Sequence, residues 1–279
     1  MINTAIIPVA GKGTRLLPFT KEIPKEMMPL YFREGMMPIV QIIFEQLYNC
    51  GIRNFIFIVG MGKRAIEDHF TPDSQYIKVL KKEKRKNIVE SMEIFYKKIS
   101  KSQIAWINQS EPKGFGDAVL HAESYIKNNK FIVHAGDACI MGKESKNIIK
   151  RILEKFENNK VDGIVATMKI KDKSSLKQYG IVTLNSEQII NVVEKPKNPK
   201  SDIAIMPIYA FTPKIFSSLK KIKPGVGNEI QLTDGIQNLI KNKNIILNCS
   251  TKKDKRFDVG TPKLYFESLK ESFWLDTKH

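Results

Sequence analysis

Short runs of apolar residues alternate with longer amphipathic segments over the first part of the chain. The apolar runs are often β-branched and are bounded by Gly, Asn or charged residues, which predicts buried parallel strands. These runs are residues 3–9, 53–60, 104–109, 130–136 and 161–169. Between them, residues 38–51 and 116–129 place apolar positions at helical spacing and end on Gly51 or on asparagines. We therefore expect a Rossmann-like α/β fold with a doubly wound sheet, which holds its ligands beyond the carboxyl ends of the strands.

The second part of the chain breaks this rhythm. Three strand-like runs follow one another too closely for helices between them, so we expect an antiparallel extension that makes the sheet mixed. These runs are residues 179–185, 188–196 and 203–211. A helix over 228–242, a strand over 244–250 and a terminal helix over 262–275 complete the prediction. No linker or internal repeat interrupts the chain, so residues 1–279 are expected to form a single domain.

Composition narrows the class of protein. A chain of 279 residues with 42% apolar composition can bury a sizeable core. No apolar run is long enough to span a membrane and the first residues do not resemble a secretory signal, so we expect a cytoplasmic protein without a membrane partner. The cysteines Cys50, Cys139 and Cys249 lie far apart, which favours free thiols over a disulfide framework or a zinc site.

The net charge of +17 raises nucleic-acid binding as another class of function. The lysines are scattered along the whole chain, however, and no aromatic-interleaved motif for single-stranded nucleic acid accompanies them. This distribution favours a solvated surface over a nucleic-acid interface. A non-catalytic nucleic-acid-binding protein is retained only as a distant alternative.

Glycines and cations follow the first predicted strand in the stretch "AGKGTRLLPFTKEIPKEM" (residues 10–27). Gly11 and Gly13 would let backbone N–H groups approach a ligand closely, as a phosphate cradle requires. Lys12, Arg15 and Lys25 would supply the opposite charge. The stretch matches neither the GxGxxG fingerprint of dinucleotide-binding proteins nor the GxxxxGK of P-loop proteins, so both of those classes lose support.

The same stretch resembles the nucleotide-binding loop of sugar-1-phosphate nucleotidyltransferases. Its "IPKEM" segment is similar to that of bacterial-type UTP–glucose-1-phosphate uridylyltransferases. The resemblance spans nearly the whole chain through further motifs in the same order: "QSEPKGFGDAV" (109–119), "GDA" (136–138), "YGIV" (179–182), "EKP" (194–196), "EIQLTDGI" (229–236) and "FDVG" (257–260).

The resemblance implies a nucleotide-diphospho-sugar transferase fold with a nucleotide-binding half (about 1–140) and a sugar-binding half (about 141–279). The antiparallel extension would lie on the sugar side. The implied enzyme joins UTP and glucose 1-phosphate into UDP-glucose and pyrophosphate by in-line attack on the α-phosphate, with Mg²⁺ as cofactor. The resemblance also implies a homodimer or homotetramer.

The resemblance assigns roles to individual residues. The residues that it implies for nucleotide binding are Ala10, Gly11, Gly13, Thr14, Gln109 and Gly114. The residues that it implies for binding of the sugar phosphate are Gly180, Glu194, Lys195 and Tyr209. Arg15, Lys25 and Lys195 would be catalytic, by holding the reacting phosphates. Asp137 and Asp258 would be the metal ligands, since carboxylate oxygens suit Mg²⁺.

Two departures from the family pattern keep closely related activities open. Pro207 stands in "MPIYAF" where uridylyltransferases usually have Gly, which points to a reshaped sugar pocket. "HAGDA" (134–138) is nearer to thymidylyltransferase-type relatives, whereas the insert at 73–101 favours the uridylyltransferase type. A thymidylyltransferase or an N-acetylglucosamine-1-phosphate uridylyltransferase of the same family is the alternative.

Overall fold

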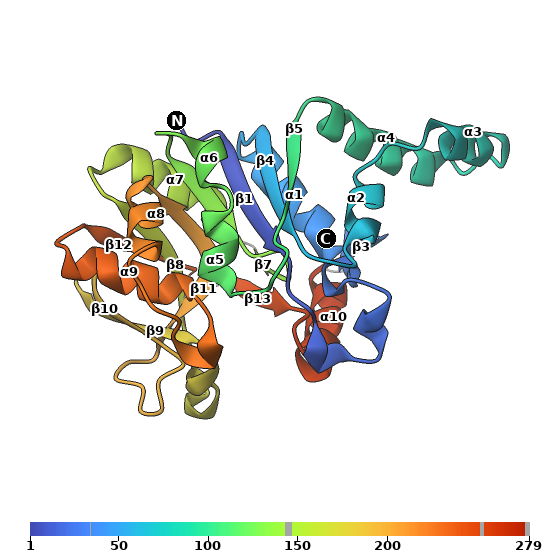
Figure 1. The fold of residues 1–279 in the computed structure, drawn as a ribbon. Coiled ribbons are helices and arrows are strands. Elements are labelled where there is room, and N and C mark those ends of the chain that lie inside the picture. Colours follow the sequence, from blue (N-terminus) through green and yellow to red (C-terminus); the bar gives the residue numbers. More distant parts are fainter. Residues whose placement is uncertain (34, 143–146, 252–253, 277–279) are drawn as a thin grey trace.

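A nine-stranded sheet runs through the computed structural model, which describes residues 1–279 except 34, 143–146, 252–253 and 277–279 (Figure 1). The strand order is β5-β4-β1-β6-β11-β8-β12-β10-β9. The strands are β1 (Thr4–Val9), β4 (Asn54–Val59), β5 (Gln103–Asn108), β6 (Phe131–His134), β8 (Gly163–Lys169), β9 (Gly180–Asn185), β10 (Gln188–Glu194), β11 (Ile203–Phe211) and β12 (Ile246–Ser250).

The sheet is mixed, as the sequence predicts. Strands β5, β4, β1 and β6 are parallel neighbours, and β9 and β10 form an antiparallel pair at the opposite edge. The predicted extension is confirmed for β9 and β10. Strand β11 also pairs antiparallel with β9, at Ala204, but most of it lies inside the sheet, antiparallel to both β6 and β8. It is suited to this central position because all its residues except the first are buried.

Helices cover both faces of the sheet, which confirms the doubly wound prediction. Neighbouring β1 residues point to opposite faces: Ile7 packs in the core with α1 (Ile39–Asn49) and α7 (Ile148–Asn158). Ile6 packs in the core with α5 (Phe115–Leu120), α6 (Glu123–Ile126), α8 (Lys214–Leu219) and α9 (Leu232–Lys241). Because both of their faces are buried, β1 and β4 are continuous apolar runs rather than alternating ones.

Two predicted helices differ from the structure in extent. The helix expected over 116–129 is two helices, α5 and α6, separated at His121 and Ala122. The helix expected over 228–242 begins only at Leu232, after the short 3-10 turn η5 (Val226–Asn228). The backbone between η5 and α9 is not helical, because it bonds to the loop before α5. The Ile230 N–H donates to the carbonyl of Lys113 at 2.8 Å, and the Gly116 N–H donates to the carbonyl of Ile230 at 2.8 Å.

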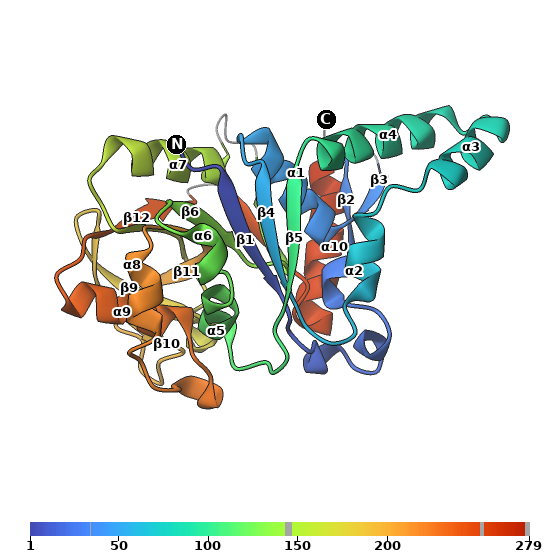
Figure 2. The same ribbon diagram turned by 45° about the horizontal axis from the view of Figure 1, so that its top comes forward.

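Smaller elements flank the sheet. A hairpin of β2 (Pro29–Phe32) and β3 (Gly35–Pro38) packs under the terminal helix α10 (Pro262–Asp276). A ribbon pairs β7 (Ala138–Met141) with β13 (Lys255–Asp258). Helix α2 (Arg64–His69) leads to the arm, α3 (Ser74–Lys82) and α4 (Lys86–Ser100), which projects from the body in Figures 1 and 2. The arm is the insert that the sequence marks at 73–101.

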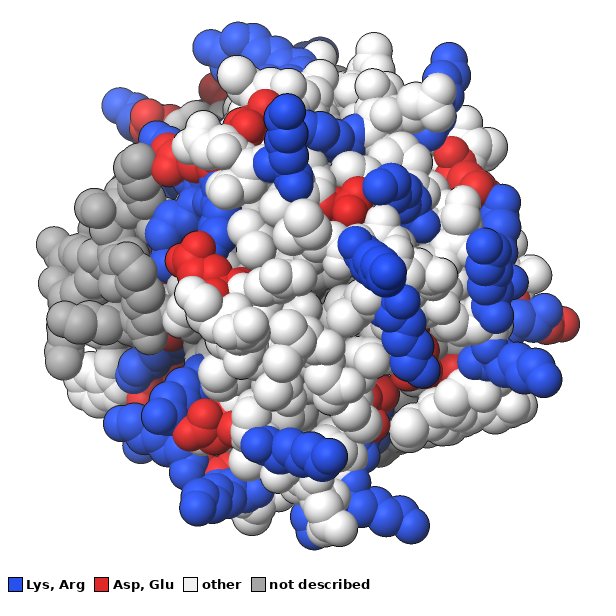
Figure 3. All heavy atoms as spheres, turned by 90° about the vertical axis from the view of Figure 1, so that its left-hand side faces the viewer, with Lys and Arg blue, Asp and Glu red and all other residues white. Residues whose placement is uncertain are grey.

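Charge is spread over the surface. On the face shown in Figure 3, Lys and Arg side chains are dispersed among uncharged and acidic residues rather than gathered in one stripe. Over the part of the chain that the structure describes, we find no helix of the length and apolar character needed to span a bilayer.

Candidate active site

The loop after β1 is folded back on itself. It contains three short 3-10 turns, η1 (Thr14–Leu16), η2 (Phe19–Lys21) and η3 (Lys25–Met27). Gly13 has a φ of 66°, in the left-handed region that favours glycine. Its carbonyl accepts hydrogen bonds from Thr20 Oγ1 at 2.8 Å and from the Leu16 N–H at 2.9 Å. These bonds hold the loop in its folded-back conformation.

A cavity of about 450 Å³ lies beyond the carboxyl ends of β1, β5 and β6, and we name it the nucleotide cavity after the residues predicted to bind the nucleotide. It brings together all six residues predicted for the nucleotide side: Ala10, Gly11, Gly13, Thr14, Gln109 and Gly114. Lys25, Glu26 and Asp137 line it as well. Residues from four separate stretches of the chain thus meet at the place that the topology of the sheet predicts.

The far wall of the nucleotide cavity depends on a close backbone approach. Gly114 has a φ of 115°, and a Cβ at this position would stand 2.6 Å from the carbonyl oxygen of Ile230. Gln109, which follows β5, is buried, and its Nε2 donates to Asp117 Oδ2 at 2.6 Å and to the Gly114 carbonyl at 3.5 Å. This wall is therefore tied to the 229–236 motif.

A second cavity, of about 250 Å³, adjoins the first, and the two share Phe115 and Ala135 in their linings. We name it the sugar cavity after the residues predicted to bind the sugar phosphate. It brings together all four residues predicted for the sugar phosphate: Gly180, Glu194, Lys195 and Tyr209. Glu194 accepts a hydrogen bond from Thr233 Oγ1 at 3.0 Å and is ion-paired with Lys195 at 3.3 Å. Lys195 has a φ of 43°, an uncommon backbone for a residue with a side chain, and strain of this kind is frequent at functional sites.

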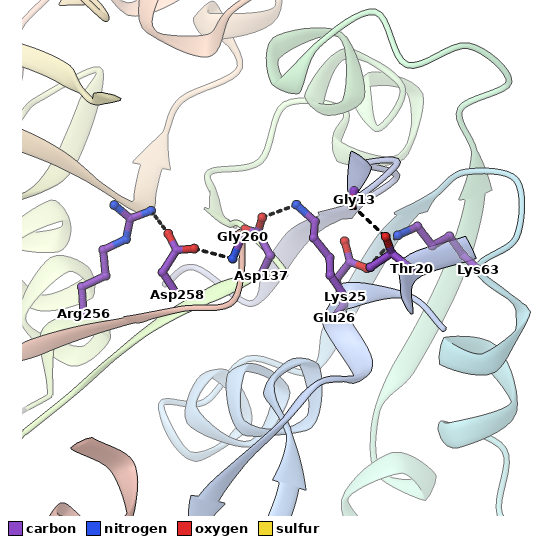
Figure 4. A network of polar contacts seen from close by, with 9 residues as sticks. All are labelled: Gly13, Thr20, Lys25, Glu26, Lys63, Asp137, Arg256, Asp258 and Gly260. Carbon is purple, nitrogen blue, oxygen red and sulfur yellow. Dashed lines mark hydrogen bonds and ion pairs between the residues drawn. The ribbon is translucent and has the colours of Figure 1, made fainter. Parts of the chain in front are cut away.

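The two predicted metal ligands lie near the junction of the cavities. Asp137 directly precedes β7, and Asp258 is the last residue of β13. Asp258 is paired in register with Ala138, the residue after Asp137, and the Val259 N–H donates to the Asp137 carbonyl at 3.1 Å. Asp137 lines the nucleotide cavity and Asp258 lines the sugar cavity. Figure 4 shows the two carboxylates between cations contributed by other parts of the site.

Each of these carboxylates has a cationic partner. Lys25 forms an ion pair with Asp137, and Arg256 forms one with Asp258, whose other oxygen accepts the Gly260 N–H at 2.6 Å. Burial would raise the pKa of Asp137, but the charge and hydrogen bond of Lys25 together with the charge of Arg256 hold this pKa below its usual value. Burial would likewise lower the pKa of Lys25, but the nearby carboxylates, Asp137 foremost, leave it raised. Both groups are therefore charged at neutral pH.

The donor set fits a divalent cation that is shared with a substrate. Within the described ranges, no group of three or more His, Cys, Asp or Glu side chains is gathered as a self-contained metal site. Two carboxylates are the number that Mg²⁺ commonly takes from a protein when phosphate oxygens and water complete its shell. Asp137 and Asp258 satisfy this requirement.

The structure places Arg15 apart from Lys25. Both were predicted to hold the reacting phosphates, but Arg15 lines the sugar cavity beside Asp258, whereas Lys25 lines the nucleotide cavity. A Cβ at Gly260 would stand 3.2 Å from an Arg15 guanidinium nitrogen, so the "FDVG" motif and the first loop meet here. The two adjoining cavities thus each contain a cation of the first loop.

Several residues at the site were not singled out from the sequence. Glu26 and Lys63 form an ion pair at 2.7 Å with almost no exposure, next to Lys25. Arg256 lies in the sugar cavity, and Thr233 orients Glu194. Three of these four lie inside or directly beside a recognised motif, so their neighbours in sequence were an available signal. Lys63 lies in no motif, and only the fold brings it to Glu26.

Comparisons with known proteins agree with this geometry. The profile of the family described as "Nucleotidyl transferase" matches residues 4–272. A Methanocaldococcus jannaschii protein, provisionally named UTP–glucose-1-phosphate uridylyltransferase, is 37% identical over 270 residues, covering 93% of this chain and 89% of its own. A Streptococcus pyogenes protein named UTP–glucose-1-phosphate uridylyltransferase 2 is 34% identical over 288 residues, covering 100% and 91%.

A solved structure also covers the full length. It is described as UDP-glucose pyrophosphorylase complexed with UDP-glucose, and it matches with a TM-score of 0.84 and 29% identity over 100% of both chains. The resemblance seen in the sequence and the expected fold are confirmed by these matches. The chain therefore belongs to the nucleotidyl transferase family.

Proposed function

We propose that this protein transfers the uridylyl group of UTP to glucose 1-phosphate, forming UDP-glucose and releasing pyrophosphate. The observation that carries the proposal is that two cavities adjoin, one beneath the Gly-rich loop and one around Glu194. Asp137 lines the first cavity and Asp258 lines the second. The names of the full-length relatives and the UDP-glucose complex of a structural neighbour support the same substrates.

The reaction needs positioning and charge rather than a general base. The phosphate of the sugar is already ionised at neutral pH, and it attacks the α-phosphorus of UTP in line while pyrophosphate leaves. Lys25, which lies close to Gly11, would bind the α-phosphate, and Lys195, in the sugar cavity, would hold the attacking phosphate. Arg15, at the sugar cavity, would neutralise charge that develops at the junction.

We propose Mg²⁺ as the cofactor, with Asp137 and Asp258 as its protein ligands. When bound, the ion would supply positive charge that offsets the negative charge of the reacting phosphates. Lys25 and Arg256 neutralise the two carboxylates in its absence, which lets two acids lie close together in a partly buried site. They would be free to contact phosphates once the acids hold the metal.

The division into halves follows the same geometry. We propose that residues 1–140 form the nucleotide-binding half and residues 141–279 the sugar-binding half of one domain. In support, the nucleotide cavity is lined by residues before 140 and by Glu229, and the sugar cavity mainly by residues after 178. Glu194 offers a carboxylate that can accept from sugar hydroxyls, and Thr233 keeps it oriented.

The alternative activities differ from the proposed one in the substrate that one of the two cavities would bind. Pro207 lines the sugar cavity, so the departure from the family pattern lies where the hexose would bind. The identity of the sugar is therefore tested by comparing N-acetylglucosamine 1-phosphate with glucose 1-phosphate, and thymidylyl transfer is tested with dTTP.

The test is an assay of pyrophosphate release and nucleotide-sugar formation by the purified protein with Mg²⁺. UTP and dTTP are each paired with glucose 1-phosphate and with N-acetylglucosamine 1-phosphate. UTP with glucose 1-phosphate is expected to have the highest kcat/KM. Absence of product from every pair would reject the proposal, and a clear preference for another pair would reassign the substrate.

We also propose that the protein assembles as a homodimer or homotetramer in the cytoplasm. Large apolar side chains are exposed on the arm (Tyr76, Val79) and on α10 (Phe266, Trp274), where a second copy could cover them. The three cysteines are free thiols, which fits a reducing compartment. Light scattering coupled to size-exclusion chromatography measures the mass, and a monomer at micromolar concentration would contradict the assembly.

A further inference from the structure

One side chain of the nucleotide cavity has its hydrogen-bonding direction set by a neighbour. Gln109 exposes 4% of its surface, and its own N–H donates to the Val59 carbonyl at 2.8 Å, which anchors the residue beyond β5. The Nε2 of its side chain donates to Asp117 Oδ2 at 2.6 Å and, more weakly, to the Gly114 carbonyl at 3.5 Å. Asp117 lies in the first turn of α5, directly after the loop that closes this cavity.

The chemistry of the partners decides which end of the amide faces them. An ionised carboxylate and a backbone carbonyl both accept hydrogen bonds and cannot donate. The amide nitrogen of Gln109 must therefore point toward Asp117 and Gly114, since the reverse orientation would bring its oxygen against two acceptors. The carbonyl oxygen, Oε1, is left for a ligand in the cavity, and no described residue donates a hydrogen bond to it.

A free carbonyl oxygen at this position distinguishes between pyrimidines. Uracil and thymine carry an N–H donor at N3, which can bond to Oε1. Cytosine has an unprotonated acceptor at N3, so its lone pair would face another lone pair in a buried site. A site that leaves buried polar groups unpaired with the wrong ligand rejects that ligand strongly.

We propose that Asp117 is a positioning residue that sets the pyrimidine selectivity of this enzyme by holding the Gln109 amide with its oxygen toward the base. Asp117 need not touch the nucleotide to do so. This inference rests on the proposed function, because it assumes that the cavity below the Gly-rich loop binds the base of a nucleoside triphosphate. Without Asp117 the amide could turn over and offer N–H to the base, which would suit cytosine.

The substitution Asp117→Asn tests the inference, because an asparagine keeps the size of the side chain but can both donate and accept. Gln109 could then adopt either orientation. The ratio of kcat/KM for UTP to that for CTP is expected to fall at least about tenfold, in line with the discrimination that one well-placed hydrogen-bonded pair gives. The ratio of UTP to dTTP should stay within about twofold, since thymine presents the same N3 edge to Gln109.

Two further variants separate positioning from a structural role. Glu111→Gln removes a negative charge from the same loop, where Glu111 is exposed and paired with Lys113, and it should leave both ratios unchanged. Asp117→Glu keeps an acceptor-only carboxylate and should therefore retain most of the wild-type selectivity for UTP over CTP. Should Asp117→Asn fold poorly, Asp117→Ser tests the same point, because a hydroxyl also donates and accepts.

Equal losses of kcat/KM with UTP, dTTP and CTP in Asp117→Asn would overturn the inference and assign Asp117 to the stability of α5. Calorimetry measures the binding of UTP and CTP to the wild type and the variant, and it separates the role of Asp117 from the proposed function. A protein that binds UTP over CTP without turnover would contradict the proposed function but not the inference, provided that Asp117→Asn removes that preference. Equal affinity of the wild type for UTP and CTP would overturn the inference.

Discussion

The ammonium group of Lys25 is ion-paired with the carboxylate of Asp137, although the two residues lie 112 positions apart in sequence. The cation also lies beneath the Gly-rich loop, where a Cβ at Gly11 would stand 3.4 Å from Lys25 Nζ. One side chain thus links the loop that would cradle the phosphates to the acid that would hold the metal. Lys25 is therefore expected to matter for turnover more than any other cation of the loop.

Replacing this cation should impair chemistry while leaving the fold in place. Lys25→Met keeps the length of the side chain but removes the charge, so we expect kcat to fall by about 10²- to 10³-fold, as for other groups that stabilise transition-state charge. Steady-state kinetics with UTP and glucose 1-phosphate measure the loss. Lys21→Met is the matched control, because Lys21 lies on the same loop with 77% of its side chain exposed. A loss below tenfold in Lys25→Met would remove it from the catalytic residues.

The two acids should act as a unit. Asp137→Asn and Asp258→Asn keep the size of each side chain and remove one charge, which should lower turnover strongly and raise the Mg²⁺ concentration needed for half-maximal rate. The double variant should lose little more than the worse single variant, since the groups share one function. Turnover against Mg²⁺ concentration is the measurement. Multiplicative losses in the double variant would show that the acids act separately.

The buried pair of Glu26 and Lys63 should contribute to stability in a way that depends on both partners. Only 2% of the Glu26 side chain and 7% of the Lys63 side chain are exposed. Lys63→Met would leave a buried carboxylate without its cation, and we expect it to lower the free energy of unfolding by about 3 to 5 kcal/mol. Urea denaturation followed by circular dichroism measures this change.

Two variants complete the measurement on this pair. Arg64→Met, in the neighbouring exposed pair with Asp68, should cost less than about 1 kcal/mol. Adding Glu26→Gln to Lys63→Met should recover part of the lost stability, because it removes the uncompensated charge. A Lys63→Met protein as stable as the wild type would show that the pair does not stabilise the fold.

His69 should make stability depend on pH. Its Nε2 lies 2.8 Å from Gln41 Oε1, and burial lowers the pKa of its imidazole from 6.5 to about 4. The unfolded chain therefore binds a proton at a higher pH than the folded chain does. The contribution is full above the unfolded pKa and is lost as pH falls toward the folded pKa, by about 2 kcal/mol between pH 7 and pH 5.

The variant His69→Gln isolates this contribution from that of other titrating groups. Urea denaturation of both proteins at pH 7 and at pH 5 gives four free energies of unfolding. The wild type is expected to lose more stability than His69→Gln on acidification. An equal loss in the two proteins would mean that the imidazole does not titrate differently on folding.

The sequence alone determined the local elements and the identity of the site motifs. The strand runs that became β1 and β4 were readable because a parallel strand buried on both faces must be apolar throughout. Gly11, Gly13 and Lys25 were recognisable because a phosphate cradle requires close backbone approach and charge within one short loop. These properties depend on residues that are near in sequence.

Only the tertiary structure decided how distant segments meet. It placed β11 between β6 and β8, set Asp258 beside Asp137 through the β7–β13 ribbon, and moved Arg15 to the sugar cavity. It also paired Gln109 with Asp117 and Lys63 with Glu26. Local periodicity carries no information about such contacts, because they are selected by the joint burial of apolar faces and the pairing of buried charges across the whole fold.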